Sequence, residues 1–576
     1  MASAPIIVIE GAPRHSPLTG YLPEILLIEG YMCFETLDLR EEALADEHLD
    51  GAAVALVEDV EVSDREAGML EDFARSGGVV VAMRPRWHQR ELFGLEPVEG
   101  TYSRAADVYL RADFSLPWLG NIPAPAFQFH GEADMQTPVD GAAVAHVGGW
   151  PDSPSIYPGV WARQVGEGWA VCFTFDLAAS VALTHQGVPR ERAHDGNPDR
   201  DRDGMLKPND FFIGYLDPNL RRLPQADLQQ ELLVRVLRHV SPIDLPRVWY
   251  FPSPTRAAAV IRGDSDGQTR RQFDDALAIA EQYGHSYTIQ MMEQHLPQFT
   301  REEAAELRER GHDIGIHPIY PLMPTLDEAG EILAQLVSRF EERYGFTPTS
   351  YVAHSCLFPG WDEFPRALAG HGCHLSFDFA AGRYFREGYL GGTGLPARFI
   401  DRGGALIDCF QQTTIQSDDG YLGPKMGLEV MEPKETEALT RDVIHDCVRF
   451  NTLYHPCCHP TNIDGHERAE SFFRCILQEL NDLKLPSFGG HQWMQFNRRR
   501  RGLTLAPREH GGELQVTVNG CAELDEFVVL LPEVADVRCD GEHLETAIVE
   551  ARGEEWMAIP LSPEGASRLE LTAGLG

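Results

Sequence analysis

Polar side chains that could carry chemistry gather at the ends of three strand-like runs in the middle of the chain. These runs end in "RGDSDG" (262–267), "GIHP" (315–318) and "LYHPCCHP" (453–460). In an extended chain, side chains two positions apart share a face, so Asp264 and Asp266 point the same way while Ser265 points away. Two adjacent carboxylates repel each other, and one becomes protonated, unless a cation lies beside them. The acidic pair is therefore a candidate for acid–base or metal chemistry.

A plain structural interpretation stands beside each cluster. Asp, Ser and Gly all favour turns, so "GDSDG" is also an ordinary turn composition. A histidine at a strand end, such as His455, is often only hydrogen-bonded, and "HPCCHP" is compatible with a proline corner over two buried thiols.

Residues 250–500 supply the scaffold that such clusters need. Repeated β–α units there predict a distorted (β/α)7 barrel of parallel strands, whose active site lies at the carboxyl ends of the strands. The alternation of side chains turns Ile314 and Ile316 outward and directs His317 to the mouth. The seven strand-like runs are "AAAVIRG", "HSYTIQM", "HDIGIH", "TSYVAH", "HLSFDF", "ALIDCFQ" and "FNTLYH".

Two further domains flank this region in a chain of 576 residues, and the predicted fold class is α/β. Residues 1–245 alternate strand-like and helical runs, which predicts an open, flavodoxin-like α/β sheet. Residues 501–576 contain short alternating strands and predict a small β-sandwich. The acidic stretch 194–204 is predicted to be a solvated loop and not a calcium loop, because Arg200 and Leu206 stand where an EF-hand needs Gly and Glu.

Composition restricts the partners. The chain has 49 basic and 88 acidic residues, a formal charge of −39, which repels phosphate backbones and anionic membranes. We therefore expect no nucleic acid and no membrane as partner, and a homo-oligomer is left open. The sequence begins without a signal-peptide pattern and contains no apolar run of membrane-spanning length, so a cytoplasmic location is predicted. The eleven scattered cysteines indicate reduced thiols.

The central region resembles the polysaccharide deacetylase family, the NodB-homology carbohydrate esterases, over about 240 residues. The order of elements and the segments "RERGHDIGIH" and "ERYGFTP" carry the resemblance. In that family an acidic pair supplies a general base and then a metal ligand, which implies these roles for Asp264 and Asp266. Its last motif ends a strand with a histidine that acts as general acid, which implies this role for His455 in "TLYHP".

Two family motifs are altered in this chain. The family follows "GHEIG" with two metal-binding histidines four residues apart, whereas "GHDIGIHPIYP" keeps His317 and has Pro321 in the second place. The third motif supplies an arginine, whereas "YVAHSCLFPGW" presents His354. Catalytic zinc takes three protein ligands, and Asp266 with His317 gives two. The prolines after His317 exclude a helix there, so a third ligand either comes from another strand end or does not exist. His354 and His459 are the candidates, and His354 is favoured because it closes the neighbouring strand.

The N-terminal part carries a second resemblance. The segments "EAGMLEDFARSGGVVVAMRP" and "GEGWAVCFTFDLAASV" resemble the glutamine-amidotransferase-like domains of trehalose-utilisation-type proteins and the middle domain of some β-galactosidases. A working amidotransferase needs a cysteine on a tight strand-to-helix turn, and neither Cys33 nor Cys172 has that context. We expect an amidotransferase-like domain without a nucleophile.

Together these features predict a metal-dependent hydrolase, with Zn as the favoured divalent cofactor. It would remove N- or O-acetyl groups, or related acyl amides, from a carbohydrate-like or small acylated substrate. Two alternatives remain open: an allantoinase-like amidase of the same barrel family, and a catalytically silent carbohydrate-binding scaffold.

Overall fold

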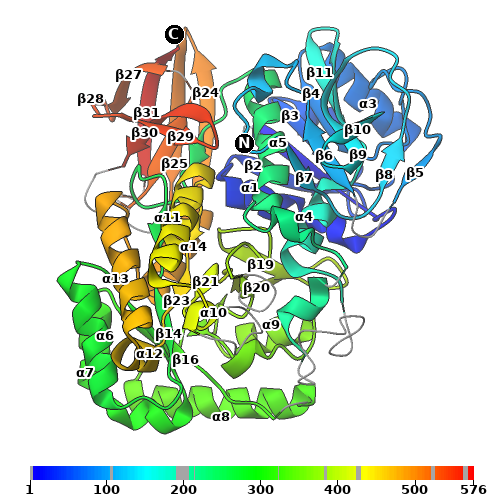
Figure 1. Cartoon of the computed structure of the whole chain (residues 1–576). Coiled ribbons are helices and arrows are strands. Elements are labelled where there is room, and N and C mark those ends of the chain that lie inside the picture. The colour runs from blue at the N-terminus through cyan, green and yellow to red at the C-terminus, as the bar shows by residue number, and fades with distance from the viewer. Residues whose placement is uncertain are drawn as a thin grey trace.

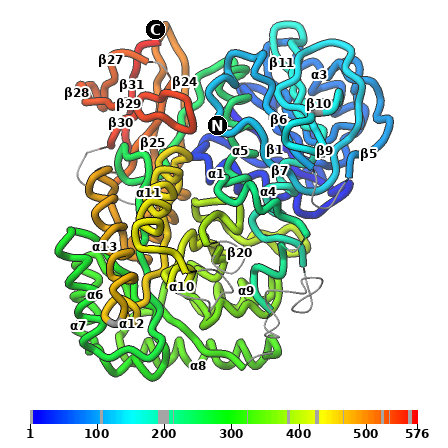
Figure 2. Tube along the Cα trace, in the orientation of Figure 1, coloured from blue at the N-terminus to red at the C-terminus, as the bar shows by residue number. Residues whose placement is uncertain are grey.

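The computed structural model describes residues 4–103, 108–189, 206–212, 214–321, 324–381, 386–422, 430–520, 524, 526–532, 534–561 and 568–575. The acidic stretch 194–204, with its loop prediction, lies outside these residues. The chain is a mixed α/β protein. The N-terminal and C-terminal parts lie side by side at the top of Figure 1, and the middle of the chain forms the part below them. The tube in Figure 2 shows the C-terminus returning to the top, on the same side of the middle part as the N-terminal sheet.

The N-terminal part is built on a nine-stranded sheet that is parallel on one side and antiparallel on the other. The parallel strands are buried apolar runs, as expected where helices cover both faces, except the edge strand β2 (Phe34–Asp38), which is largely exposed. They are β2 (Phe34–Asp38), β1 (Ile6–Glu10), β3 (Val54–Val57), β4 (Val79–Met83) and β11 (Gly168–Phe173). The antiparallel strands are β10 (Ser153–Val165), β9 (Ala142–Trp150), β6 (Tyr109–Ala112) and β7 (Ala126–Gln128). Its helices are α1 (Leu22–Glu29), α3 (Asp64–Arg75), α4 (Leu177–Gln186) and α5 (Gln225–Val240).

Neither candidate nucleophile of this part lies on a strand-to-helix turn. Cys33 is buried just before β2, and Cys172 is buried inside β11. Burial raises the pKa of the Cys33 thiol to about 12 and that of Cys172 well above its ordinary value, so both stay protonated. No disulfide joins the cysteines in the described part of the chain.

The middle part contains a second nine-stranded sheet, which curls and keeps two separate ends. Each of the seven predicted strand-like runs contains a strand. In sheet order the strands are β19 (Ala397–Ile400), β20 (Leu406–Gln411), β18 (Leu375–Ser376), β17 (Ser350–Tyr351), β16 (Asp313–Ile316), β15 (Thr288–Met291), β14 (Arg262–Asp264), β23 (Pro456–Cys457) and β21 (Gln416–Ser417). All neighbours are parallel except β19 and β20. A short pair, β13 (Ala258–Ala259) with β22 (Leu453–Tyr454), lies beside it. The sequence did not indicate β19 or β21.

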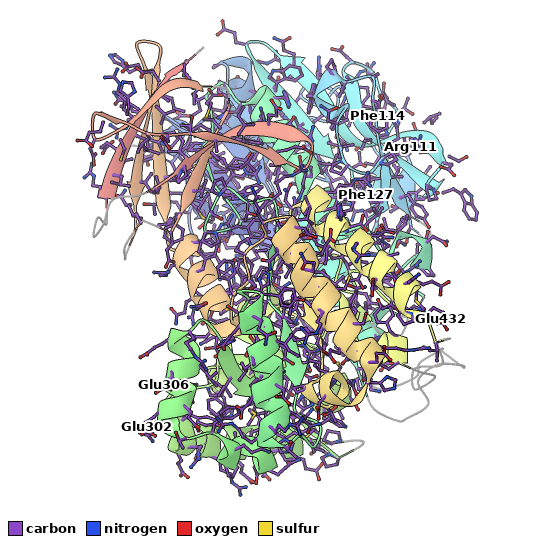
Figure 3. All side chains as sticks on the ribbon, turned by 60° about the vertical axis from the view of Figure 1, so that its left-hand side comes forward. Arg111, Phe114, Phe127, Glu302, Glu306 and Glu432 are labelled. Atoms are coloured by element: carbon purple, nitrogen blue, oxygen red, sulfur yellow. The ribbon has the colours of Figure 1, made fainter. Side chains whose placement is uncertain are left out.

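The helices around this sheet follow the sequence signals. In α7 (Arg301–Glu309) the Thr300 side chain caps the Glu303 N–H; Ala304 and Leu307 are buried, while Glu302 and Glu306 lie on the outer face (Figure 3). In α8 (Leu326–Tyr344) an apolar stripe that includes Leu333, Leu336 and Phe340 is buried, and the helix ends at Gly345 in the left-handed conformation. The other helices are α6 (Arg270–Gln282), α9 (Glu363–Gly370), α10 (Asp419–Leu422), α11 (Pro433–Phe450), α12 (Pro460–Gly465), α13 (Glu467–Asp482) and α14 (Gly490–Arg501).

The C-terminal part consists of two antiparallel sheets. One contains β26 (Val528–Leu531), β30 (Glu554–Pro560) and β29 (Ala547–Ala551), and β12 (Arg247–Val248) from the segment before the middle part adds its edge. The other contains β24 (Thr504–His510), β25 (Glu513–Asn519), β31 (Arg568–Leu575), β27 (Val534–Cys539) and β28 (Glu542–His543).

A buried ionic cluster joins the parts. The Glu29 carboxylate of α1 accepts from Arg247 at 2.8 Å and from Arg552 at 2.8 Å, and all three side chains are almost fully buried. The Tyr250 hydroxyl donates to the same carboxylate at 2.5 Å. A buried ion pair of this kind fixes one arrangement of its elements, because separating the partners would leave an uncompensated charge. In the described part of the chain, no helix has the length and apolar character needed to cross a membrane.

Candidate metal and acid–base site

The carboxyl ends of β14, β16, β17 and β23 bring five polar side chains together. Asp266 follows β14, and its carboxylate lies among three imidazoles. Its Oδ1 is 3.3 Å from Nε2 of His317 and 3.3 Å from Nδ1 of His354. Its Oδ2 is 3.5 Å from Nε2 of His459, which in turn lies 3.9 Å from Oδ2 of Asp264. The structure therefore brings Asp264, Asp266, His317 and His354 together, with His459 on the opposite side of Asp266.

Two of the histidines have a ring nitrogen fixed by a partner outside the cluster. Nδ1 of His317 donates to the Val352 carbonyl at 2.8 Å, and Nε2 of the same ring faces Asp266. Nδ1 of His459 is 2.6 Å from Oδ1 of Asp418, and the His459 main-chain N–H donates to the same carboxylate at 2.8 Å. Such outer partners orient histidines toward metals or toward protons in transfer.

Charges in the cluster favour a cation. Burial acts to raise the pKa of Asp266, but hydrogen bonds from His317 and His354 outweigh it and hold the pKa below its usual range. The hydrogen bond to Asp266 raises the pKa of His354. Burial acts to lower the pKa of His459, but the Asp418 carboxylate raises it well above its ordinary value. The metal-free site thus holds protons on imidazoles beside carboxylates, and a metal ion would replace those protons.

His354 stands on a strained loop that other segments hold. The 3-10 turn η6 (His354–Cys356) has two non-glycine residues in the left-handed region, Ser355 at φ 61° and Cys356 at φ 54°. Such conformations persist only where the surroundings impose them, and they concentrate at functional sites. The His354 N–H donates to the Pro318 carbonyl at 2.9 Å, which ties this loop to the one that carries His317.

The N-terminal part also contacts the loop that carries His354. The Phe358 N–H donates to the Leu206 carbonyl at 2.8 Å, and the rings of Phe211 and Phe358 meet edge to face with centroids 6.1 Å apart. Further along the loop, Nε1 of Trp361 donates to the Gln186 carbonyl at 3.0 Å. Gln186, Leu206 and Phe211 therefore help to set the position of the loop that carries His354.

This contact predicts that Phe211→Ala weakens metal binding. Losing the ring loosens the loop, and removing an outer support of a ligand typically costs about 10-fold in metal affinity. The dissociation constant is measured by competition with a chelator. Phe212→Ala is the matched control, because Phe212 is equally buried but packs on Phe379, at 6.2 Å between centroids.

A coupling test identifies the route of this effect. If Phe211 acts through His354, then adding Phe211→Ala to the His354→Ala protein should change the metal dissociation constant little further. Because the site of His354→Ala binds metal more weakly, both of these proteins are titrated at higher metal concentrations. Equal losses from Phe211→Ala and Phe212→Ala would show instead a general loss of packing.

Asp264 is held by a residue that the sequence analysis did not single out. The Arg262 guanidinium, two residues earlier on β14, donates to Oδ1 of Asp264, and both side chains are buried. Burial acts to raise the pKa of Asp264, but Arg262 outweighs it, so the pKa lies below its ordinary value. Asp264 is therefore ionised at neutral pH, with Oδ2 directed toward His459. An arginine directly before an acidic pair, in "VIRGDSDG", was the available signal.

His455 lies deeper than the other histidines. Its Nδ1 donates to the Val260 carbonyl at 2.6 Å, and its ring packs on Phe377 with centroids 4.2 Å apart. Arg262 pairs with Cys457 across the strands, so the residue level with Asp264 is His459 and not His455. Burial, helped by Arg262, lowers the pKa of His455 to about 3. The ring is therefore neutral at neutral pH, and its Nε2 has no hydrogen-bond partner among the described residues.

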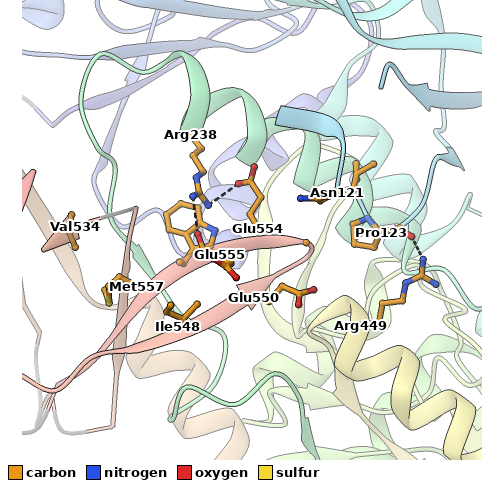
Figure 4. A pocket seen from close by; sticks show the side chains of 13 residues that line it. Asn121, Pro123, Arg238, Arg449, Val534, Ile548, Glu550, Glu554, Glu555 and Met557 are labelled. Atoms are coloured by element: carbon orange, nitrogen blue, oxygen red, sulfur yellow. Dashed lines mark hydrogen bonds and ion pairs between the residues drawn. The ribbon is translucent and has the colours of Figure 1, made fainter. Parts of the chain in front are cut away.

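A separate cavity of about 1000 Å³ lies where the C-terminal sheet meets α5, α11 and the segment 121–123 (Figure 4). Arg238 there forms an ion pair with Glu554 at 3.0 Å and lies over the Trp556 ring at 4.4 Å. None of the polar clusters of the strand ends lines this cavity. Glu550 there pairs with Arg256, and the Arg449 guanidinium donates to the Pro123 carbonyl. The groups of possible metal ligands gather at the strand ends, so we place the chemistry there.

Comparison with known proteins gives partial likenesses. No family model matches the sequence, and no curated protein matches it. A solved structure described as a polysaccharide deacetylase from Mycobacterium smegmatis is 17% identical, with a TM-score of 0.34 over 43% of this chain and 92% of that one. A peptidoglycan deacetylase from Bacillus subtilis is 15% identical, with a TM-score of 0.23 over 43% and 96%. A β-galactosidase from Bacillus circulans sp. alkalophilus is 10% identical, with a TM-score of 0.24 over 31% and 30%. The structural neighbours include deacetylases and glycosidases, and TM-scores this low assign no role to any residue of this chain.

Proposed function

We propose that the chain is a metal-dependent hydrolase that removes acetyl or related acyl groups from a carbohydrate-like substrate. The observation that carries this proposal is the Asp266 carboxylate, which meets two imidazole nitrogens at 3.3 Å beside a second, ionised carboxylate. Donor atoms that share one tetrahedral zinc ion lie about 3.4 Å apart. Asp266, His317 and His354 fit such an ion, and their donor atoms all lie within 4.8 Å of one another.

Each residue then has a definite task. When bound, a divalent metal supplies a Lewis acid that polarises a carbonyl and lowers the pKa of water. Asp264 accepts a proton from the attacking water at Oδ2, because Arg262 occupies Oδ1 and keeps the carboxylate ionised. Arg262 acts through Asp264 and is a positioning residue.

The leaving group needs a proton, and two histidines compete to supply it. The resemblance implies His455, which is neutral in its buried position and must first gain a proton. His459 carries a proton already, and its Nε2 faces Asp266 and Asp264 while Asp418 holds Nδ1. We therefore favour His459 as the acid and keep His455 as the alternative.

The ligand and acid roles predict different failures. His354→Ala should lower the metal content of the purified protein, because it removes a ligand. His459→Ala should keep the metal and lose the limb of the pH–rate profile that reports an acid. His455→Ala serves as the comparison for that limb. Metal loss in His459→Ala, with metal kept in His354→Ala, would move the third ligand to His459.

Acetate release from a panel of acetylated mono- and oligosaccharides tests the activity. Four acidic groups, Asp264, Asp266, Asp418 and Asp419, stand near the mouth, so neutral or cationic substrates are expected to react better than anionic ones. Ammonia or ring-opened product from cyclic amides, without acetate release, would favour the allantoinase-like alternative. Saccharide binding without turnover would favour the silent scaffold.

A further inference from the structure

Asp266 separates two groups of metal-ligating atoms. Its Oδ1 faces His317 and His354, whereas its Oδ2 faces His459. Beyond His459 lies a second group, Asp264, Cys457 and His459, whose donor atoms also lie within 4.8 Å of one another. Cys457 has no role in the proposed chemistry. All three residues of this second group are buried.

The spacing of the second group suits a metal ion. Nε2 of His459 is 3.9 Å from Oδ2 of Asp264 and 4.0 Å from Sγ of Cys457. Atoms that share a tetrahedral zinc ion are separated by about 3.4 Å, so each of these two distances exceeds that separation by about half an ångström. The third pair of donor atoms, from Asp264 and Cys457, lies within 4.8 Å. Oδ2 of Asp266, at 3.5 Å from the same Nε2, can bridge the two groups.

Asp264 and His459 each have two polar side-chain atoms, and one of the two already has a hydrogen-bond partner outside the second group. Arg262 occupies Oδ1 of Asp264, which leaves Oδ2. Asp418 occupies Nδ1 of His459, which leaves Nε2, in the carboxylate–histidine arrangement found behind metal ligands. Oδ2 of Asp264 and Nε2 of His459 are the donor atoms that remain, and they lie 3.9 Å apart.

We propose that Asp264, Cys457 and His459, with Asp266 as a bridge, form a second site for a zinc-class metal ion, and that filling it inhibits the enzyme. Thiolate and imidazole donors favour zinc or cobalt(II) over magnesium or calcium. The Cys457 thiol and the His459 imidazolium each release one proton to solvent as the ion binds.

Inhibition follows from the identity of the ligands, and this part rests on the proposed function. Asp264 is the base and His459 the favoured acid, so an ion bound to both removes their capacity to move protons. The first site, at Asp266, His317 and His354, keeps its ligands. Such a site makes the enzyme sensitive to a metal level higher than the one that activates it.

Cobalt(II) titration of metal-stripped full-length protein tests the site without activity. We expect two equivalents to bind, with a near-ultraviolet thiolate-to-cobalt band that develops with the second equivalent. The band should be absent in Cys457→Ser and present in Cys458→Ser. Cys458 is the matched control because it is an adjacent buried thiol that belongs to neither donor group. Saturation at one equivalent, or a band that survives in Cys457→Ser, would overturn the second site.

Acetate release at one equivalent and at excess zinc tests the inhibition, with each variant compared with its own rate at one equivalent. Excess zinc should lower the rate at least 10-fold in the unaltered protein and in Cys458→Ser, and have little effect in Cys457→Ser. The second site could show the expected cobalt band while excess zinc fails to lower the rate. This result would overturn the inhibitory role of the site, and with it the roles of Asp264 as base and His459 as acid. If the unaltered protein releases no acetate, the proposed function fails, and the cobalt titration still decides the site.

Discussion

Asp266→Asn should lose both bound metal and turnover. The amide keeps the size of the side chain but removes the charge that faces His317, His354 and His459. Lewis-acid assistance is worth several kcal/mol, so the rate should fall on the order of 10³- to 10⁴-fold. Elemental analysis and acetate release are measured on the same preparation. Full metal content in this variant would show that the ligand set lies elsewhere.

Asp313→Asn is the control for this substitution. Asp313 is a buried carboxylate at the first residue of β16, the strand that leads to His317, and it pairs with Arg308 at 3.0 Å. Its substitution should lower stability and leave the metal in place. Equal metal loss in both variants would show that any buried charge change on these strands disturbs the site.

Asp264→Asn should keep the metal of the first site and lose turnover. Its carboxylate contacts Arg262 and faces His459, and it belongs to the second donor group, not to the group of His317 and His354. Removing a general base costs about 10²- to 10⁴-fold. Single-turnover rates measured with one equivalent of zinc report this loss directly. A fully active Asp264→Asn protein would mean that "GDSDG" is only a turn.

The sequence predicted the elements well where the signals are local. Each of the seven predicted strand-like runs contains a strand, because a strand depends on side-chain periodicity within one segment. The antiparallel half of the N-terminal sheet was not foreseen, because β9 and β10 pair through register shifts that no local pattern marks.

The candidate site, too, was predictable from the sequence only in part. Strand order alone was enough to expect Asp266, His317 and His354 at one edge. The sequence did not show which of His455 and His459 lies level with Asp264, because both follow strand-like residues. The pairing of Arg262 with Cys457 in the structure decides this in favour of His459. The roles of Arg262 and Asp418 depend on contacts between side chains, which periodicity does not report. The same holds for the contacts of Leu206 and Phe211 with the loop that carries His354.

The most direct test of the account is metal dependence in one preparation. Protein stripped with a chelator is reconstituted with increasing zinc, and bound metal and acetate release are measured at each step. We expect no activity in the stripped protein and activity that rises in proportion to the first equivalent bound. Acetate release by the stripped protein at the reconstituted rate would contradict the account.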